Sequence, residues 1–141
     1  MFTKQKPSTK WIGRRFEAYT AFWLKSRNYK ILKRNFVAGN KEIDIIAMKG
    51  STICFVEVKS ELINTENEGK ETPPEKITPR KMQNIISAAK AYINELRQNS
   101  IDPEEFHFRF DGVGILFDTE YNMKEFKYYE NLYEVDQDAL F

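Results

Sequence analysis

Cysteine and histidine are almost absent from this chain. Its 141 residues include a single cysteine, Cys54, and a single histidine, His107. One thiol excludes an internal disulfide framework and any zinc site that is built from several thiolates. A lone cysteine is typical of a reducing compartment. We therefore expect a fold held together by a hydrophobic core, which a chain of this length is able to build.

Long apolar runs are also missing. No uncharged stretch approaches the roughly 20 apolar residues that a membrane-spanning helix needs. The first ten residues are polar and carry Lys4, Lys6 and Lys10, so they do not resemble a secretory signal. These absences predict a cytoplasmic protein with no membrane partner. The length predicts one domain, covering residues 1–141.

Acidic residues are scarce in the first third of the chain. Residues 1–41 contain eleven Lys or Arg and one acid, Glu17, whereas residues 42–141 carry a net charge of −9. The overall charge of +1 therefore conceals a strongly basic segment of +10. Such an asymmetry favours a polyanionic partner such as nucleic acid. The alternative is that the two parts neutralise each other within the fold.

Hydrophobic periodicity predicts two helices and five strands. The expected helices cover residues 9–27, with Thr9 as the cap, and residues 79–99, with Thr78 as the cap. The expected strands cover residues 29–37, 42–48, 52–59, 106–117 and 125–133. Residues 60–77 lack apolar periodicity and predict a long mobile loop. The order α-β-β-β-α-β-β predicts an α/β domain with a mixed sheet and flanking helices.

Three charged side chains stand on strands that should be buried. Glu57 and Lys59 project to one face of the third strand, since side chains alternate along a strand. If the second and third strands pair through the turn at 49–51, Asp44 lies opposite residues 56–57. Two neighbouring carboxylates repel each other and raise each other's pKa, unless a divalent cation lies between them. The alternative is an ordinary ion pair between Glu57 and Lys59, with Asp44 solvated.

Asp44 and Glu57 would then be metal ligands, because Mg²⁺ (or Mn²⁺) prefers a few hard oxygen ligands together with water and phosphate. Such an ion polarises a phosphodiester and lowers the pKa of a bound water. Lys59 would stabilise the developing charge. Glu17, on the first helix, would bind the metal through water or orient it.

Several blocks of the sequence carry a family resemblance. They are Gly13-x-x-x-Glu17, Arg34-Asn35-Phe36, Glu42-Ile43-Asp44, Phe55-Val56-Glu57-Val58-Lys59, Lys81 and Arg109-Phe110-Asp111. The chain resembles the PD-(D/E)xK nucleases and is similar in spacing to archaeal Holliday junction resolvases. It is identified as a member of the uncharacterised bacterial UPF0102 (YraN-like) family.

The resemblance implies a three-layer, restriction-endonuclease-like fold, with Asp44, Glu57 and Lys59 as the catalytic triad and Glu17 as its fourth member. It implies a metal-dependent endonuclease that hydrolyses DNA, with branched DNA as one option. The alternative is an inactive nuclease-fold module that binds nucleic acid or a protein. Resolvases of this fold act as dimers, so a homodimer is an expectation by analogy. Glu61 departs from the family pattern and adds an acid beside the motif.

Five cations are candidates for contacting the nucleic-acid backbone: Lys10, Arg14, Arg15, Arg34 and Lys81. A solvated surface position is an equal alternative for Lys81. Arg109 and Asp111 share a strand face, and we expect a mutual ion pair rather than a substrate contact. Cys54 is expected in the core, on the face opposite Glu57.

Overall fold

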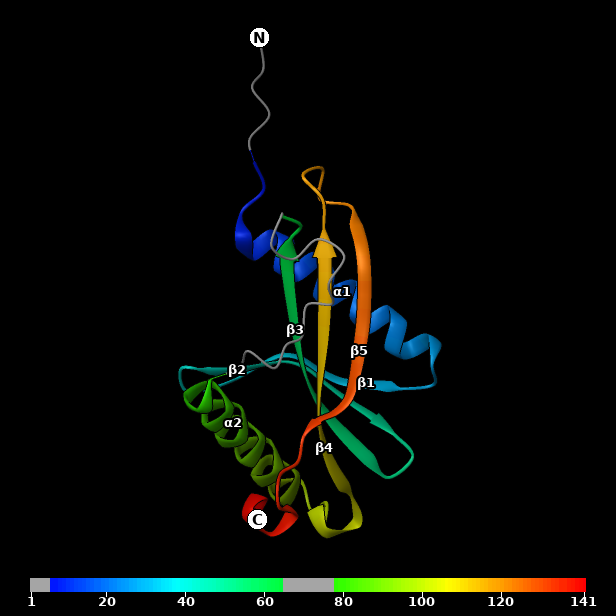
Figure 1. The fold of residues 1–141 in the computed structure, drawn as a ribbon. Helices are drawn as coiled ribbons and strands as arrows, with labels where there is room; N and C mark the ends of the chain where they lie inside the picture. The colour runs from blue at the N-terminus through cyan, green and yellow to red at the C-terminus, as the bar shows by residue number, and fades with distance from the viewer. Residues whose placement is uncertain (1–5, 65–77) are drawn as a thin grey trace.

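The computed structural model describes residues 6–64 and 78–141. Along the chain, the helices and strands are α1 (Thr9–Ser26), β1 (Lys30–Ala38), β2 (Lys41–Lys49), β3 (Thr52–Leu62), α2 (Pro79–Gln98), β4 (His107–Phe117) and β5 (Met123–Tyr133) (Figure 1). This is the predicted order. Two short 3-10 helices, Pro103–Glu105 and Gln137–Leu140, are additional to the prediction.

The five strands form one mixed sheet in the order β1-β2-β3-β4-β5. Neighbouring strands are antiparallel, except that β3 and β4 are parallel. The parallel pair requires a crossover, and α2 provides it between the two strands. The α/β class and the mixed sheet are confirmed, and the layout is consistent with a restriction-endonuclease-like fold.

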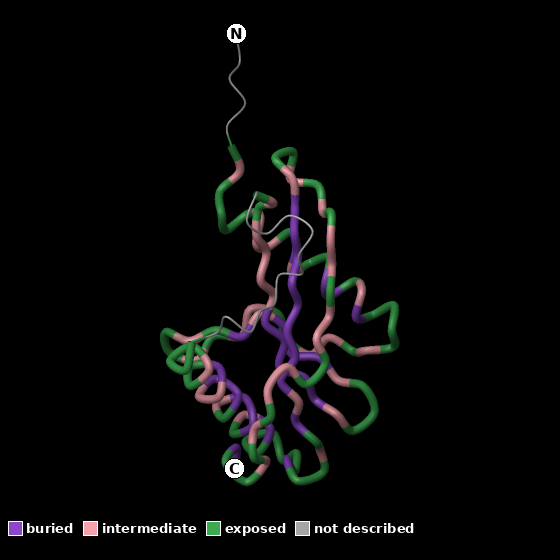
Figure 2. The backbone as a smooth tube through the Cα atoms, viewed as in Figure 1, coloured by how far each residue is buried: buried purple, intermediate pink, exposed green. Residues whose placement is uncertain are grey.

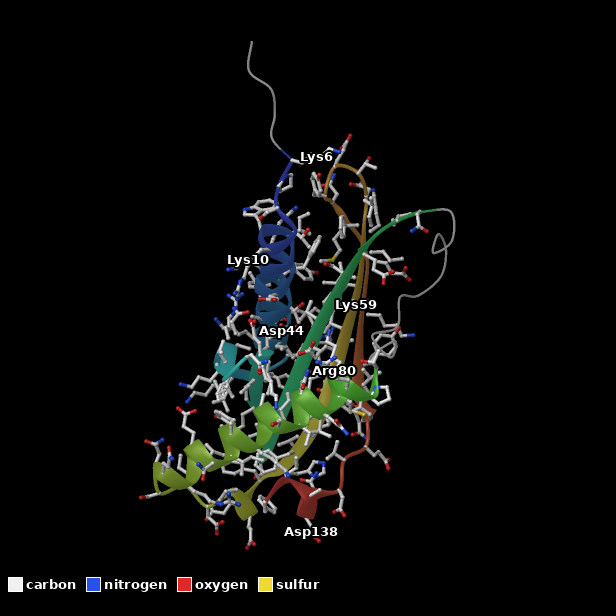
Figure 3. The ribbon with its side chains drawn as sticks, turned by 90° about the vertical axis from the view of Figure 1, so that its left-hand side faces the viewer. Lys6, Lys10, Asp44, Lys59, Arg80 and Asp138 are labelled. Carbon is white, nitrogen blue, oxygen red and sulfur yellow. The ribbon has the colours of Figure 1, made fainter. Side chains whose placement is uncertain are left out.

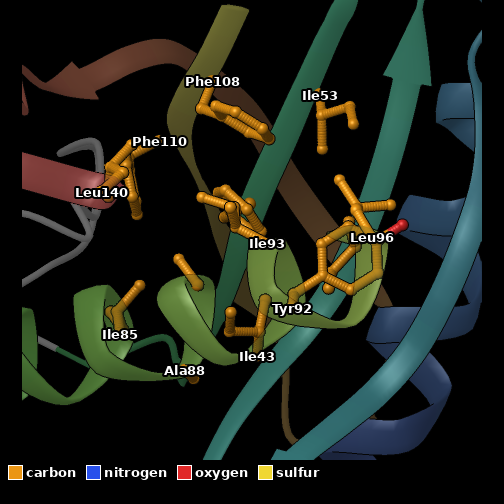
Figure 4. Packing of buried hydrophobic residues seen from close by; sticks show 13 residues of the cluster. Ile43, Ile53, Ile85, Ala88, Tyr92, Ile93, Leu96, Phe108, Phe110 and Leu140 are labelled. Atoms are coloured by element: carbon orange, nitrogen blue, oxygen red, sulfur yellow. The ribbon is translucent and has the colours of Figure 1, made fainter. Parts of the chain in front are cut away.

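The two helices cover opposite faces of the sheet, and the alternation of side chains along β3 shows this directly. Ile53 and Phe55 pack in a cluster with α2 residues such as Ile93 (Figure 4). Cys54 and Val56 pack in a second cluster with α1 residues. The buried residues accordingly lie mainly in the central strands and on the inner side of α2 (Figure 2). The result is three layers, with Cys54 in the core as predicted.

Strand β3 extends beyond its predicted end at residue 59. Its parallel pairing with β4 continues through Leu62↔Phe117. The predicted loop therefore cannot begin at residue 60, because β4 supplies hydrogen-bond partners for three further residues. Most of the remaining loop, residues 65–77, lies outside the described residues.

Both helices begin at a side-chain cap. The Ser8 hydroxyl accepts a hydrogen bond from the amide of Trp11 at 3.1 Å. The predicted cap, Thr9, is wrong by one position, because Thr9 is already the first helical residue. The Thr78 hydroxyl accepts from the amide of Lys81 at 3.2 Å, with Pro79 at the first helical position, as predicted. In the described ranges, no helix has the length and apolar character needed to span a membrane.

Replacing the cap of α2 tests how firmly its first turn is fixed. Thr78→Ala leaves the amide of Lys81 without its side-chain acceptor, and we expect a loss of about 1 kcal/mol in the free energy of unfolding. Urea denaturation of Thr78→Ala and Thr78→Ser measures it. Thr78→Ser retains the oxygen and should remain close to wild type, so equal losses in both variants would contradict the capping role.

Candidate active site

The candidate site lies where β2 separates from β3. The two strands pair from Lys49↔Thr52 to Ile45↔Val56, and their pairing stops there although both strands continue. At the next position, Asp44 Oδ2 accepts a hydrogen bond from the amide of Val58 at 2.8 Å. The Asp44 carboxylate thus takes the place of a backbone carbonyl of β2 as the acceptor for the Val58 amide, at the point where the two strands separate. Figure 3 shows Asp44 and Lys59 between α1 and the first turn of α2, where Arg80 is labelled.

Glu57 lies on the α2 side of β3 and is only 8% exposed. It continues the apolar face formed by Ile53 and Phe55. Its Oε2 lies 3.5 Å from Lys81 Nζ, in the first turn of α2. Since the Lys81 side chain is 54% exposed, this ammonium compensates only part of the cost of burying a carboxylate.

The two strand carboxylates influence each other. Burial, followed by the charge of Asp44, raises the pKa of Glu57 to about 8. Burial also raises the pKa of Asp44, although the hydrogen bond from Val58 opposes the shift. The negative charge in this part of the sheet therefore exceeds what the surrounding cations neutralise.

Glu17 brings a third acid to this region from α1. Burial, followed by the charge of Asp44, raises the pKa of Glu17 to about 7. Its Oε2 is buried and has no hydrogen-bond donor among the described residues, although Arg14 Nη1 lies 3.7 Å away. The same guanidinium nitrogen lies 3.8 Å from Glu42 Oε1. Asp44 therefore couples electrostatically to Glu17, on α1, and to Glu57, on the α2 side of the sheet.

The raised pKa of Glu57 predicts how stability depends on pH. Between the ordinary value of 4.5 and about 8, the folded chain binds more protons at Glu57 than the unfolded chain does. The stabilisation that this extra proton gives the folded chain is therefore complete at low pH, and it is lost as the pH rises through this window. Glu57→Gln stays neutral, so its free energy of unfolding should exceed that of wild type by roughly 2 kcal/mol near pH 8.5.

Urea denaturation at several pH values between about 5.5 and 8.5 measures this difference. Glu104→Gln, at an exposed position in the 3-10 helix Pro103–Glu105, is the matched control and should follow wild type. If the free energy of unfolding changes with pH in the same way in wild type and Glu57→Gln, Glu57 does not titrate in this window.

Lys59 forms an ion pair with Glu61 and not with Glu57. Its Nζ lies 3.3 Å from Glu61 Oε1, and both side chains are about one-third exposed. The alternative of an ordinary Glu57–Lys59 ion pair is therefore wrong, because Glu57 pairs with Lys81 instead. Glu61, the acid that departs from the family pattern, thus lies beside the motif and pairs with its lysine.

The five candidate nucleic-acid contacts separate into two groups. Arg14, Arg34 and Lys81 lie near the acids, since Arg14 and Arg34 act on the charge of Glu17 and Lys81 pairs with Glu57. Lys10 is exposed one helical turn before Arg14, on the same side of α1.

Arg15 points elsewhere. Its Nη1 donates to the carbonyl of Tyr121 at 2.6 Å, in the turn between β4 and β5. Its guanidinium also lies 5.8 Å from the centre of the Trp11 ring. Arg15 thus fastens α1 to that turn, and the structure does not group it with the acids.

Arg109 and Asp111 form the expected mutual ion pair. Two guanidinium nitrogens donate to the two carboxylate oxygens, each at 2.8 Å. These residues pair with Cys54 and Val56 of β3, which face α1. The pair is therefore on the face opposite Glu57, which explains why it contributes to the fold rather than to the site.

Sequence reasoning missed Asn35. It lies between the paired positions Arg34↔Ile45 and Phe36↔Ile43, and hence opposite Asp44. Its backbone has a φ of 53°, and its buried Oδ1 has no hydrogen-bond partner within residues 6–64 and 78–141. The available signal was an asparagine inside a strand pattern, because asparagine tolerates the left-handed region better than most residues.

Comparison with known proteins identifies the family. The profile described as "Uncharacterised protein family UPF0102" matches residues 16–115. A UPF0102 protein of Chlorobium chlorochromatii (strain CaD3) is 40% identical over 108 residues, which cover 77% of this chain and 76% of that protein. A UPF0102 protein of Clostridium perfringens is 33% identical over 130 residues, covering 92% of this chain and 99% of that protein. The matched range includes Glu17, Asp44, Glu57 and Lys59, and the chain belongs to the UPF0102 family.

Proposed function

We propose that this protein is a metal-dependent nuclease that hydrolyses phosphodiester bonds in DNA. One observation carries the proposal: the Asp44 carboxylate is fixed at the opening between β2 and β3, and its charge adds to burial in raising the pKa of the Glu57 carboxyl. A buried acid pair of this kind is costly for folding, and functional sites are where such perturbed groups concentrate.

The residues at this opening suit a divalent cation. In the part of the chain that the structure describes, Glu57 pairs with the partly exposed ammonium of Lys81, and Glu17 keeps a buried oxygen without a donor. No group of three or more His, Cys, Asp or Glu side chains forms a metal site within residues 6–64 and 78–141. Two carboxylates with open positions match Mg²⁺, which retains several waters and binds phosphate oxygens.

Asp44 and Glu57 would hold the Mg²⁺ or Mn²⁺ ion. When bound, the ion would polarise the scissile phosphate and lower the pKa of an attacking water. The hydrogen bond from Val58 fixes the Asp44 carboxylate, and burial fixes Glu57, so both ligands are oriented in advance. Glu17, whose pKa is raised in part by the charge of Asp44, would bind the metal through a water molecule.

Lys59 would supply positive charge to the reacting phosphate. It shares its strand face with Glu57, and its present partner Glu61 holds it only by a partly exposed ion pair. Such pairs contribute about 0–1 kcal/mol, so exchanging Glu61 for a phosphate oxygen costs little. In that position the ammonium would stabilise the charge that develops during hydrolysis.

The basic side chains around the opening would bind the phosphate backbone. Lys10 and Arg14 follow one side of α1, and Arg34 and Lys81 reach the acids from β1 and α2. Together they place cations on both helices that border the opening. This distribution fits a substrate that is larger than one nucleotide.

A second candidate function is an inactive nuclease-fold module that binds nucleic acid or a protein partner. Two ion pairs favour it, because Lys59 and Lys81 are each engaged by a carboxylate. In such a module these pairs would persist, and no metal would enter.

The two functions differ in a cleavage assay. A labelled four-way junction, a 5′ flap and a linear duplex are incubated with the full chain and Mg²⁺ or Mn²⁺, with a chelator as the blank. The proposal expects metal-dependent products from wild type and none from Glu57→Gln. Salt-sensitive DNA binding without any cleavage, and without metal binding in calorimetry, would establish the inactive module instead.

A further inference from the structure

A second candidate binding site lies at the C-terminal end of α1. It is a solvent-open cavity of about 500 Å³, lined by Trp23, Arg27, Tyr29, Lys49, Phe126, Lys127, Tyr128 and Glu130. In Figure 1 the end of α1, the turn between β2 and β3, and β5 converge there, on the side of the molecule away from α2. The cavity is therefore distinct from the opening that holds Asp44 and Glu57.

Aromatic rings form its walls. The Trp23 ring stacks on Tyr128 with a centroid distance of 4.9 Å and an angle of 23°. Phe126 packs against the same indole at 5.2 Å. The guanidinium of Arg27 lies 4.4 Å from the centre of the Trp23 ring. Flat rings and a flat cation at one position offer a stacking surface for a nucleobase.

Positive charge surrounds these rings. Arg27, Lys49 and Lys127 are exposed, and the Lys49 ammonium lies 5.3 Å from the centre of the Tyr29 ring. The single acid of the lining, Glu130, is bound at 2.7 Å by Arg109 from beneath the sheet surface. Within the described ranges, Arg27 and Lys49 have aromatic rings as partners and no carboxylate at ion-pair distance. These two cations are available to an anion such as a phosphate.

Partly buried hydrogen bonds fix the floor of the cavity. Arg109 donates to the hydroxyl of Tyr29 at 2.7 Å, and the hydroxyl of Tyr128 donates to Asp111. Asp111 is fully buried. Both tyrosine rings are therefore held in place before any ligand arrives, which lowers the entropic cost of binding.

We propose that this cavity binds one unpaired nucleotide of a single-stranded nucleic acid. The base stacks on the outer face of the Arg27 guanidinium, which lies over the Trp23 ring, and the adjoining phosphate lies between Arg27 and Lys49. Rings give sequence-tolerant stacking, and the cations give salt-dependent affinity. The site requires no metal and does not depend on cleavage at Asp44 and Glu57.

Fluorescence anisotropy with a labelled ten-nucleotide oligo(dT), in the presence of a chelator, tests the proposal. Arg27→Ala and Lys49→Ala should each weaken binding by roughly tenfold at low salt and reduce the salt dependence of binding by about one phosphate contact. Lys90→Ala, which removes an exposed cation on α2, is the matched control and should bind as wild type does. Circular dichroism verifies that each variant is folded.

Tryptophan emission gives a second readout. In the Trp11→Phe protein, Trp23 is the only indole, and oligo(dT) should quench its emission whereas a blunt duplex of the same length should not. Unchanged Trp23 emission, equal quenching by the duplex, or equal affinity of Arg27→Ala and Lys90→Ala would each overturn the proposal. Loss of a dimer in Arg27→Ala, with unchanged affinity for oligo(dT), would assign the cavity to self-association instead.

Discussion

Asp44→Asn is expected to reduce metal-dependent DNA cleavage by roughly 100-fold or more, because a ligand loss exceeds the effect typical of outer-shell partners. The variant keeps an oxygen that accepts the hydrogen bond from Val58, which is 2.8 Å long in the wild-type chain. It removes one negative charge beside Glu57 and Glu17, so the pKa values of both acids should fall. Loss of activity should therefore occur without loss of stability.

Asp44→Ala separates the two roles of this residue. It removes the charge and also the acceptor, which leaves the Val58 amide without a side-chain partner and should cost about 1–3 kcal/mol. Cleavage assays and urea denaturation of wild type, Asp44→Asn and Asp44→Ala form the comparison. Retained cleavage in Asp44→Asn would remove Asp44 from the metal site, whereas equal stability of all three proteins would remove its structural role.

The largest loss of stability is expected from Asp111→Ala. The carboxylate is fully buried and accepts hydrogen bonds from Arg109, from the hydroxyl of Tyr128 and from the amide of Asn131. The last of these supports an irregular stretch of β5, where the register with β4 shifts and Asn131 has a φ of 52°. Removal leaves the guanidinium of Arg109 largely buried without its main counterion, and breaking such a pair costs roughly 3–5 kcal/mol.

Calorimetry or urea denaturation measures this loss. Glu130→Gln is the matched control, because it removes the other acid paired with Arg109 at a side chain that is 64% exposed. Its effect should stay below about 1 kcal/mol, as for other exposed ion pairs. A loss in Asp111→Ala as small as that of Glu130→Gln would mean that the network contributes little to the fold.

Much of this architecture follows from short-range patterns in the sequence. Because the turn after β2 is short, the residue numbers of paired positions sum to 101, as in Ile45↔Val56, which is one of the two registers that the turn predicts. Alternation along β3 then places Glu57 and Cys54 on opposite faces. Helix α2 begins at the predicted cap, because a Thr-Pro pair favours a helix start.

The partners of the exposed cations could not be predicted in the same way. Lys81 reaches Glu57 only because α2 returns across the sheet with its first turn beside β3, and this depends on the long connection between them. Lys59 could pair with Glu57 or Glu61 by alternation alone, and the structure selects Glu61. The separation of β2 from β3 at Asp44 was not predicted either, since both segments continue as strands beyond their last paired position.

The most direct test of the central claim is a crystal structure of the full chain grown with Mn²⁺ near pH 8, with anomalous scattering used to locate the ion. We expect one anomalous peak within coordination distance of the carboxylates of Asp44 and Glu57, and Lys81 displaced from Glu57. Absence of a peak at saturating Mn²⁺, with the Lys81–Glu57 ion pair intact, would contradict the account.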